Sequence, residues 1–262
     1  MNTATQTRNP LNIEYIAPNV IKFPSPSTYP SHHTPTPQSP KNKKQEHKLP
    51  VQPLIGSQIQ QAIQFFEQRP EKRKGTNIRD LTLFCFAIST GFRVSDLVRL
   101  KVSTVLKDNI IVDQIVWKEW KTRDNPNVKP RIVTLSDKIK TMLYTYIQEY
   151  IIPQSTIANT NPIDAYLFPP TGNPTKQMVE KNFYRKMKAL EVGLGFDKDK
   201  PLGCHTTRKT PARKIIDDHP NDPMALITVM NMLNHKSQKT TLHYIGSLQD
   251  ELANVYRTLD II

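Results

Sequence analysis

Residues 78–90, IRDLTLFCFAIST, are the segment that most restricts how this chain can fold. If the segment is helical, apolar side chains lie on almost every face of it, instead of on a single stripe. A helix of that kind is stable only when it is buried. The segment therefore predicts a central helix around which the rest of a domain packs.

Further segments have the apolar spacing of amphipathic helices or carry helix-start residues. They are residues 56–68, 91–100, 136–151, 173–190, 205–218, 222–234, 238–245 and 247–260. Pro174 is expected near the first turn of its helix. Pro211 fits a helix only near its beginning, so Arg208 is expected in the first part of the same helix.

Residues 105–135 depart from the helical pattern. Residues 109–121 and 131–136 are rich in β-branched and aromatic side chains, which is typical of strands. The polar residues 122–130 between them are expected to form the tip of a hairpin. The predicted fold class is therefore mainly α with a small antiparallel β-sheet (α+β).

The first part of the chain differs in composition from the rest. Residues 1–50 hold nine of the 22 prolines and little periodic apolar content, so they cannot bury enough surface to offset chain entropy. Their basic end, residues 41–48, has two open interpretations, a DNA contact and a solvated tail. We expect a disordered, proline-rich basic tail over 1–50 and one folded domain over 51–262.

The charge balance indicates the class of partner. Lys and Arg number 36 against 23 Asp and Glu, a formal charge of +13, which suits a polyanion such as nucleic acid. A membrane surface is the alternative, but no apolar run approaches the ~18 residues that a span requires. We find no secretory-signal pattern and no glycine-rich nucleotide loop. Cys85 and Cys204 are expected to be reduced thiols, in a cytoplasmic, nucleoid-associated protein.

Several polar residues are candidates for chemistry. His205 and Arg208 lie three positions apart, so they project from one face of a helix. Arg93 precedes a helix start, a favourable place to bind an anion. Tyr244 follows His235 by nine residues. Each also has a plainer interpretation: an exposed arginine, a core tyrosine, or a histidine at the end of a helix.

Taken in chain order, these motifs resemble the tyrosine recombinase (phage integrase) family over roughly residues 55–260. The matching segments are TGFRVSDLVRL, WKTR, HTTRKT and LNHKSQKTTLHYIG. They fill all six positions of the family's active site with Arg93, Lys121, His205, Arg208, His235 and Tyr244. Lys118 and Lys129 lie on the same predicted hairpin, but the Lys-Thr pair after a strand favours Lys121.

The resemblance implies a covalent reaction on DNA. Tyr244 would attack a phosphodiester and form a 3′-phosphotyrosyl bond, leaving a free 5′-hydroxyl. Arg93 and Arg208 would hold the non-bridging oxygens, with His235 as a third donor.

Two further residues would move protons in this reaction. Lys121 would protonate the departing 5′-oxygen, and His205 would manage the proton of the phenol. Since two guanidiniums supply the positive charge, neither a metal nor another cofactor is expected.

The remaining expectations concern binding and assembly. Residues expected to contact DNA are Arg123, Lys129, Lys209 and Lys236. The expected partners are double-stranded DNA, a homo-tetramer on that DNA (a monomer or dimer when free) and an accessory protein, with no membrane. The C-terminal helix over 247–260 is expected to pack either on a neighbouring protomer or on its own domain.

Two departures from the family pattern stand out. Lys209-Thr210 replaces the commoner His-Thr, and the separate helical core-binding domain usual in the family is expected to be missing, as in a short form. The overall prediction is a site-specific DNA recombinase that is independent of metal and ATP. The alternatives are a catalytically inactive DNA-binding accessory or regulatory relative and a type IB topoisomerase.

Overall fold

We describe the protein from a computed structural model, which describes residues 14–15, 21–22, 50–71, 73–196, 199–245 and 256–259. Contacts divide the chain into two units, Met1–His47 and Lys48–Ile262. In the first unit, β1 (Glu14–Tyr15) and β2 (Ile21–Lys22) form an antiparallel pair. The disorder predicted for 1–50 otherwise falls outside the described residues.

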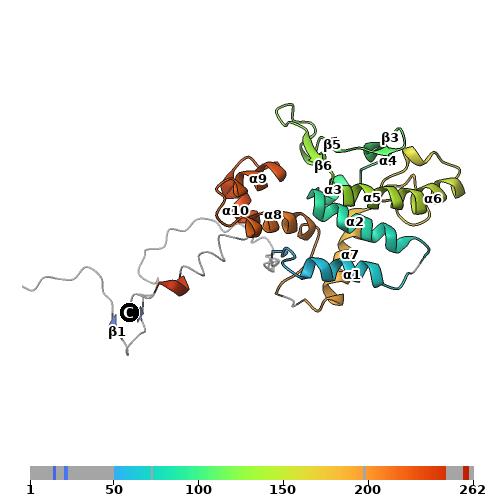
Figure 1. Cartoon of the computed structure of the whole chain (residues 1–262). Coiled ribbons are helices and arrows are strands. Elements are labelled where there is room, and N and C mark those ends of the chain that lie inside the picture. The colour runs from blue at the N-terminus through green and yellow to red at the C-terminus, as the bar shows by residue number, and fades with distance from the viewer. Residues whose placement is uncertain are drawn as a thin grey trace, which may run out of the picture. The chain divides into compact units, whose positions relative to one another are not determined.

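The second unit is mainly helical, as Figure 1 shows. Its α-helices are α1 (Gln58–Gln68), α2 (Thr76–Thr90), α3 (Val94–Leu97), α4 (Val102–Val105), α5 (Asp137–Tyr146), α6 (Ile152–Ile157), α7 (Glu180–Gly193), α8 (Thr206–Asp218), α9 (Ala225–Met232) and α10 (Gln238–Ile245). A π-helical turn, Ile147–Ile151, joins α5 to α6. No helix among the described residues is long and apolar enough to cross a membrane.

The strands of this unit form two short antiparallel ladders. They are β3 (Leu106–Lys107) with β4 (Ile110–Ile111), and β5 (Gln114–Trp117) with β6 (Arg131–Thr134). The predicted fold class is confirmed. The strand predicted over 109–121 is wrong in its extent, because it is interrupted after Ile111 and ends at Trp117. A 3₁₀ turn, Trp120–Thr122, follows it.

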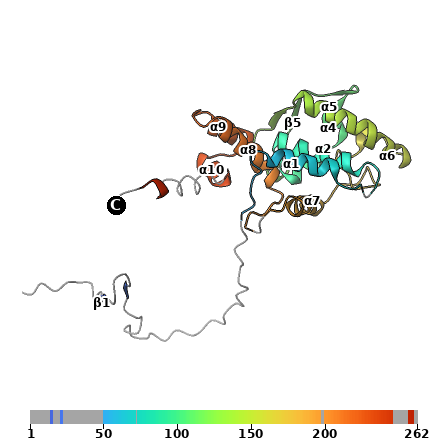
Figure 2. The same cartoon turned by 60° about the horizontal axis from the view of Figure 1, so that its bottom comes forward.

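Helix α2 is the buried central helix that the sequence predicts. It packs against α1, α5 and α8, and it runs between α1 and α7 on one side and α5 on the other (Figures 1 and 2). Leu83, Phe84 and Phe86 are each no more than 1% exposed. Each such side chain stabilises the fold by about 1.5–3 kcal/mol through burial, so α2 is a rigid support for whatever lies at its two ends.

Helices α8, α9 and α10 have a small core of their own. Ala212 of α8, Val229 and Leu233 of α9 and its end, and Ile245 of α10 form a hydrophobic cluster separate from the main one. Tyr244 packs partly against it. Since α8 also packs on α2, this cluster holds α9 and α10 beside the C-terminal end of the central helix.

Some predicted helix bounds need correction. Helix α7 begins at Glu180 instead of 173, and Pro174 precedes it, with its carbonyl accepting a hydrogen bond from the backbone N–H of Tyr166. Helix α8 begins at Thr206, so Arg208 lies in its first turn as predicted. The helix predicted over 247–260 falls largely outside the described residues.

Candidate active site

Tyr244 and His205 meet although they come from different helices. Tyr244 lies near the end of α10, and His205 is the residue that precedes α8. The phenolic oxygen is 3.1 Å from Nδ1 of His205, and the two rings meet edge to face with centroids 5.9 Å apart. The phenol is therefore within proton-transfer distance of an imidazole nitrogen.

The surroundings of this pair set the resting protonation state of both groups. Burial raises the pKa of Tyr244 to about 12, although Arg208 and Arg93 act in the opposite direction. Burial also lowers the pKa of His205, and the positive charges of Arg208 and Lys209 lower it further. At neutral pH the phenol is protonated and the imidazole is neutral, so Nδ1 is free to accept the proton.

Arg208 is fixed by two backbone carbonyls. Its side chain is 2% exposed, and its guanidinium donates to the carbonyl of Gly91 at 2.6 Å and to that of Leu233 at 2.5 Å. Gly91 and Leu233 are the C-cap residues of α2 and α9, so one guanidinium joins the two helix ends. A guanidinium held in this way has little freedom to reorient.

Gly91 has a left-handed backbone conformation that lets it end α2 and direct its carbonyl toward the site. It ends α2 with φ at 60°, in the left-handed region that favours glycine. This turn aims its carbonyl at the guanidiniums of both Arg208 and Arg131. The Thr-Gly dipeptide in TGFRVSD thus explains how the end of α2 becomes an anchor for arginine side chains.

A buried carboxylate lies between Arg93 and Arg208, the two arginines predicted to hold the non-bridging phosphate oxygens. Glu119 is 1% exposed, and it pairs with Arg93 through Oε2 and approaches Nη1 of Arg208 with Oε1 at 3.6 Å. Asn234 donates to Oε2 of Glu119 at 3.3 Å. Arg93 and Arg208 are therefore brought together, with one negative charge between them.

His235 lies just beyond α9 and faces the nucleophile candidate. Its ring meets that of Tyr244 edge to face with centroids 5.3 Å apart, and its Nδ1 is 3.1 Å from Oγ1 of Thr241. Burial, with the charges of Arg208 and Arg93, lowers the pKa of His235 to about 4. The imidazole is therefore neutral at pH 7. A neutral imidazole carries one N–H, so Nε2 can donate to an anion only when the Thr241 hydroxyl, which donates to the Ser237 carbonyl at 3.2 Å, turns to donate to Nδ1.

Lys121 is placed differently from the sequence prediction. It lies in the 3₁₀ turn and not at the end of a strand, because Asp96 draws this segment onto α3. The buried Asp96 accepts hydrogen bonds from the Trp117 side chain at 2.9 Å and from the Trp120 backbone at 2.7 Å. Lys121 is exposed, and its charge contributes to the lowered pKa of His205.

The four residues expected to contact DNA lie in different environments. Lys129 and Lys236 are exposed, and Arg123 stacks on the Trp120 ring at 3.2 Å. Lys209 is only 9% exposed, with its Nζ 5.3 Å from the centre of the Tyr244 ring. Its ammonium thus faces the phenol instead of solvent, and a DNA contact from Lys209 stays a prediction.

Three charged residues of the site are absent from the candidate set drawn from the sequence. They are Glu119, Asp96 and Arg131, each buried. Burial lowers the pKa of Arg131 to about 10, and its guanidinium bonds to the carbonyls of Thr90 and Gly91. The one available signal for Glu119 is an acidic residue two positions before Lys121 in a basic connection.

In the described part of the chain, no three His, Cys, Asp or Glu side chains are grouped so that they could hold a metal ion.

Comparison with known proteins places this arrangement in a family. Residues 53–251 match the phage integrase family, which covers most of the second unit. This chain belongs to the phage integrase family. This is the same family that the motifs carrying Arg93, Lys121, His205, Arg208, His235 and Tyr244 resemble.

Individual relatives of this integrase-family chain are distant. A probable integrase/recombinase of Bacillus subtilis (strain 168), YoeC, is 25% identical over 203 residues, covering 76% of this chain and 96% of that protein. The tyrosine recombinase XerD of Staphylococcus saprophyticus is 27% identical over 192 residues, covering 72% of this chain and 57% of that protein.

Solved structures share the fold. The site-specific recombinase XerH, bound to palindromic difH substrate after cleavage, has a TM-score of 0.57 at 18% identity and covers 83% of this chain and 55% of its own. The recombinase XerA has a TM-score of 0.52 at 21% identity and covers 86% of this chain and 66% of its own. The chain thus spans little more than half the length of XerD and XerH.

Proposed function

We propose that this protein is a site-specific DNA recombinase that cuts and rejoins strands through Tyr244. The observation that carries the proposal is the position of the Tyr244 oxygen, 3.1 Å from a neutral imidazole and beside a pair of gathered guanidiniums. A phosphoryl-transfer site needs this combination of a nucleophile, a proton acceptor and fixed positive charge.

In the first step, the Tyr244 oxygen attacks phosphorus while its proton passes to Nδ1 of His205. The bond from phosphorus to the 5′-oxygen breaks, and Lys121 donates a proton to that oxygen. Arg93, Arg208 and His235 hold the non-bridging oxygens as negative charge grows on them. The products are a 3′-phosphotyrosyl bond and a free 5′-hydroxyl.

In the second step, a 5′-hydroxyl of another strand attacks the same phosphorus and gives its proton to Lys121, which was left neutral by the first step. The phosphotyrosyl bond breaks, and Tyr244 regains its proton from His205. Because the number of phosphoester bonds is conserved, the exchange needs no ATP. Because the guanidiniums supply the charge, we propose that it needs no metal ion.

The proposed partner is double-stranded DNA, on which four copies would assemble across two sites. The formal charge of +13 and membership of the family support DNA as the partner. An accessory protein and a location at the nucleoid in the cytoplasm complete the proposal. Integration, excision, inversion and resolution all share this chemistry.

A suicide substrate tests the proposal. A duplex nicked beside the cut site loses the short fragment after cleavage, which traps the protein–DNA bond as a slower band on a denaturing gel. We expect this band from the wild-type chain and its loss in Tyr244→Phe, with duplex binding retained in both. Binding without a band from the wild-type chain would indicate a non-cleaving accessory protein.

A second measurement separates recombination from topoisomerase activity. A recombinase joins the cleaved strand to a partner duplex, so we expect joint products of new length from two labelled duplexes. Relaxation of supercoiled DNA without any joint product would identify a topoisomerase instead.

A further inference from the structure

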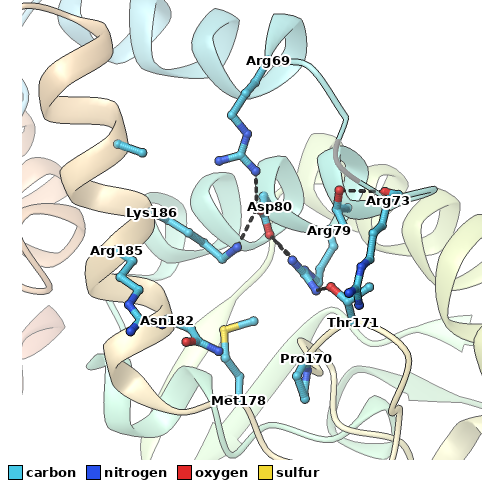
Figure 3. Close-up of a pocket in the computed structure, with 12 residues that line it drawn as sticks. Arg69, Arg73, Arg79, Asp80, Pro170, Thr171, Met178, Asn182, Arg185 and Lys186 are labelled. Atoms are coloured by element: carbon cyan, nitrogen blue, oxygen red, sulfur yellow. Dashed lines mark hydrogen bonds and ion pairs between the residues drawn. The ribbon is translucent and has the colours of Figure 1, made fainter.

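A second basic site lies at the other end of the central helix. It is a cavity of about 460 Å³ formed by the α1–α2 connection, the first turns of α2, the segment around Thr171 and one face of α7. Figure 3 shows the side chains that surround it. Arg79, which lines it, precedes Gly91 by twelve residues, a distance of about 18 Å along a helix. The cavity is therefore separate from the candidate active site.

An ion network forms the inner wall of this cavity. Asp80 is 1% exposed, and its Oδ2 accepts from Arg69 and from Lys186, each at 2.6 Å. Its Oδ1 accepts from Arg79 at 2.9 Å. Burial would raise the pKa of Asp80, but Arg79 and Lys186 outweigh it and lower the pKa, so the carboxylate is ionised.

Arg79 is also fixed on its other side. Its Nη1 donates to Oγ1 of Thr171 at 2.8 Å and to the carbonyl of Pro169 at 3.3 Å. A guanidinium that is 5% exposed and bonded in three directions is pre-organised, and it keeps its charge because its pKa is raised above the usual value. The inner wall thus presents a fixed positive field to the cavity.

The cavity has more positive charge than this network uses. Five cationic residues line it, namely Arg69, Arg73, Arg79, Arg185 and Lys186, against the single carboxylate of Asp80, which leaves 5 − 1 = 4 positive charges. Arg73 and Arg185 are exposed, and in the described part of the chain neither makes an ion pair. In Figure 3 they lie on opposite sides of the cavity, one on the α1–α2 connection and one on α7.

A purely structural role explains only part of this arrangement. Arg69, Arg79 and Lys186 hold α1, α2 and α7 together through Asp80, and this accounts for their burial. It does not account for two further arginines that flank the same cavity without a carboxylate partner. Guanidinium groups match the geometry of phosphate oxygens, and a cavity of this volume is large enough for a small ligand.

We propose that this cavity binds a phosphate-bearing anion, with Arg73 and Arg185 as the contacting residues and Arg79 and Lys186 as the fixed field behind them. Phosphate could come from the backbone of a duplex beyond the cut site or from a small polyphosphate. The proposal is independent of the role of Tyr244, because no residue of the candidate active site lines the cavity.

The first experiment uses inorganic pyrophosphate as the probe and isothermal titration calorimetry of the full chain. The test variant is Arg73→Gln/Arg185→Gln, and the matched control is Lys74→Gln/Lys181→Gln. The control removes the same charge from the same connection and helix, but at exposed residues outside the cavity. Thermal unfolding checks that both variants fold. For a polyphosphate site we expect pyrophosphate to bind at least tenfold more weakly to the test variant, with little change in the control.

The second experiment asks whether DNA supplies the phosphate. Duplex affinity is measured against salt concentration on the Tyr244→Phe background, so that cleavage plays no part. If the cavity holds backbone phosphates, the test variant lowers the slope of log affinity against log salt by about one to two, and more than the control does. Weaker pyrophosphate binding with an unchanged slope assigns a small polyphosphate. If the two double variants match in both experiments, the proposal is overturned.

Discussion

The phenolic oxygen of Tyr244 lies 3.1 Å from Nδ1 of His205, so α10 places its hydroxyl at the start of α8. Because the pKa of Tyr244 is raised to about 12, its attack on phosphorus depends on a neighbouring base. The pKa of His205, lowered from 6.5 by burial and nearby positive charge, keeps that base neutral at pH 7.

The first prediction concerns the pH dependence of cleavage. A histidine with a lowered pKa is neutral above that pKa and is protonated, and so lost as a base, below it. The acidic midpoint of the cleavage rate constant at subsaturating suicide substrate should therefore lie below pH 6.5. His205→Asn should be slower by ~10²–10⁴ at pH 7 and should lose this acidic fall.

His235→Asn is the matched control for this profile. The pKa of His235 is lowered to about 4, so its removal should slow cleavage without moving the fall assigned to His205. A wild-type midpoint at or above pH 6.5, or an unchanged acidic fall in His205→Asn, would assign the proton acceptor elsewhere.

The second prediction concerns Glu119, the buried carboxylate between Arg93 and Arg208. In Glu119→Gln the two guanidiniums lose their counter-charge, so the free energy of unfolding should drop by about 3 kcal/mol, the lower end for a broken buried pair. Added sulfate should restore part of this stability, since a tetrahedral anion can lie between the two arginines. Urea denaturation with and without sulfate measures both effects.

Glu180→Gln is the control for charge removal. Glu180 pairs with Arg99 only at 3.9 Å, and its side chain is 55% exposed, so the change in stability should stay below ~1 kcal/mol with no special response to sulfate. Equal stability and equal sulfate response in the two variants would show that Glu119 does not neutralise the arginine pair.

The third prediction tests the anchor at the end of α2. Gly91→Ala places a side chain at φ 60°, and its Cβ would lie 3.2 Å from Cε of Met232, so we expect a loss of about 1–2 kcal/mol in thermal unfolding. Since the Gly91 carbonyl holds Arg208, cleavage should fall more than stability alone explains. Gly172→Ala carries the same strain at φ 77° with nothing within 4 Å, and it should leave cleavage unchanged. Equal cleavage in the two variants would contradict the anchoring role.

Much of the fold follows from short-range patterns in the sequence. The segment 78–90 predicts the buried helix α2 because its apolar residues occupy almost every face, and that property does not depend on its neighbours. The predicted start of α7, at residue 173, is wrong because Pro174 fits a first helical turn as well as a loop. Tertiary contacts place Pro174 in a loop; one of them is the hydrogen bond from the backbone N–H of Tyr166 to the Pro174 carbonyl.

In the site too, some features follow from sequence spacing and others depend on tertiary contacts. The spacing of His205, Arg208, His235 and Tyr244 is visible in the sequence, and the fold brings these four side chains together. Glu119 and Asp96 are not predictable in this way, because their partners are distant in sequence. Glu119 contacts Arg93, Arg208 and Asn234, and Asp96 accepts hydrogen bonds from Trp117 and Trp120. The position of Lys121 in a 3₁₀ turn follows from those contacts and not from β propensity.

The last prediction concerns Lys121 and the leaving group. If Lys121 protonates the departing 5′-oxygen, Lys121→Ala should slow cleavage of ordinary DNA by ~10²–10⁴. Replacing that bridging oxygen by sulfur removes the need for a proton, because a thiolate with a pKa near ~8.5 is a good leaving group on its own. Lys121→Ala should then cleave the sulfur substrate almost as fast as the wild-type chain. Lys118→Ala, which removes an exposed lysine of the same connection, should behave as wild type on both substrates. A Lys121→Ala variant that is equally slow on both substrates, or a rescue seen only for Lys118→Ala, would move the proton donor away from Lys121.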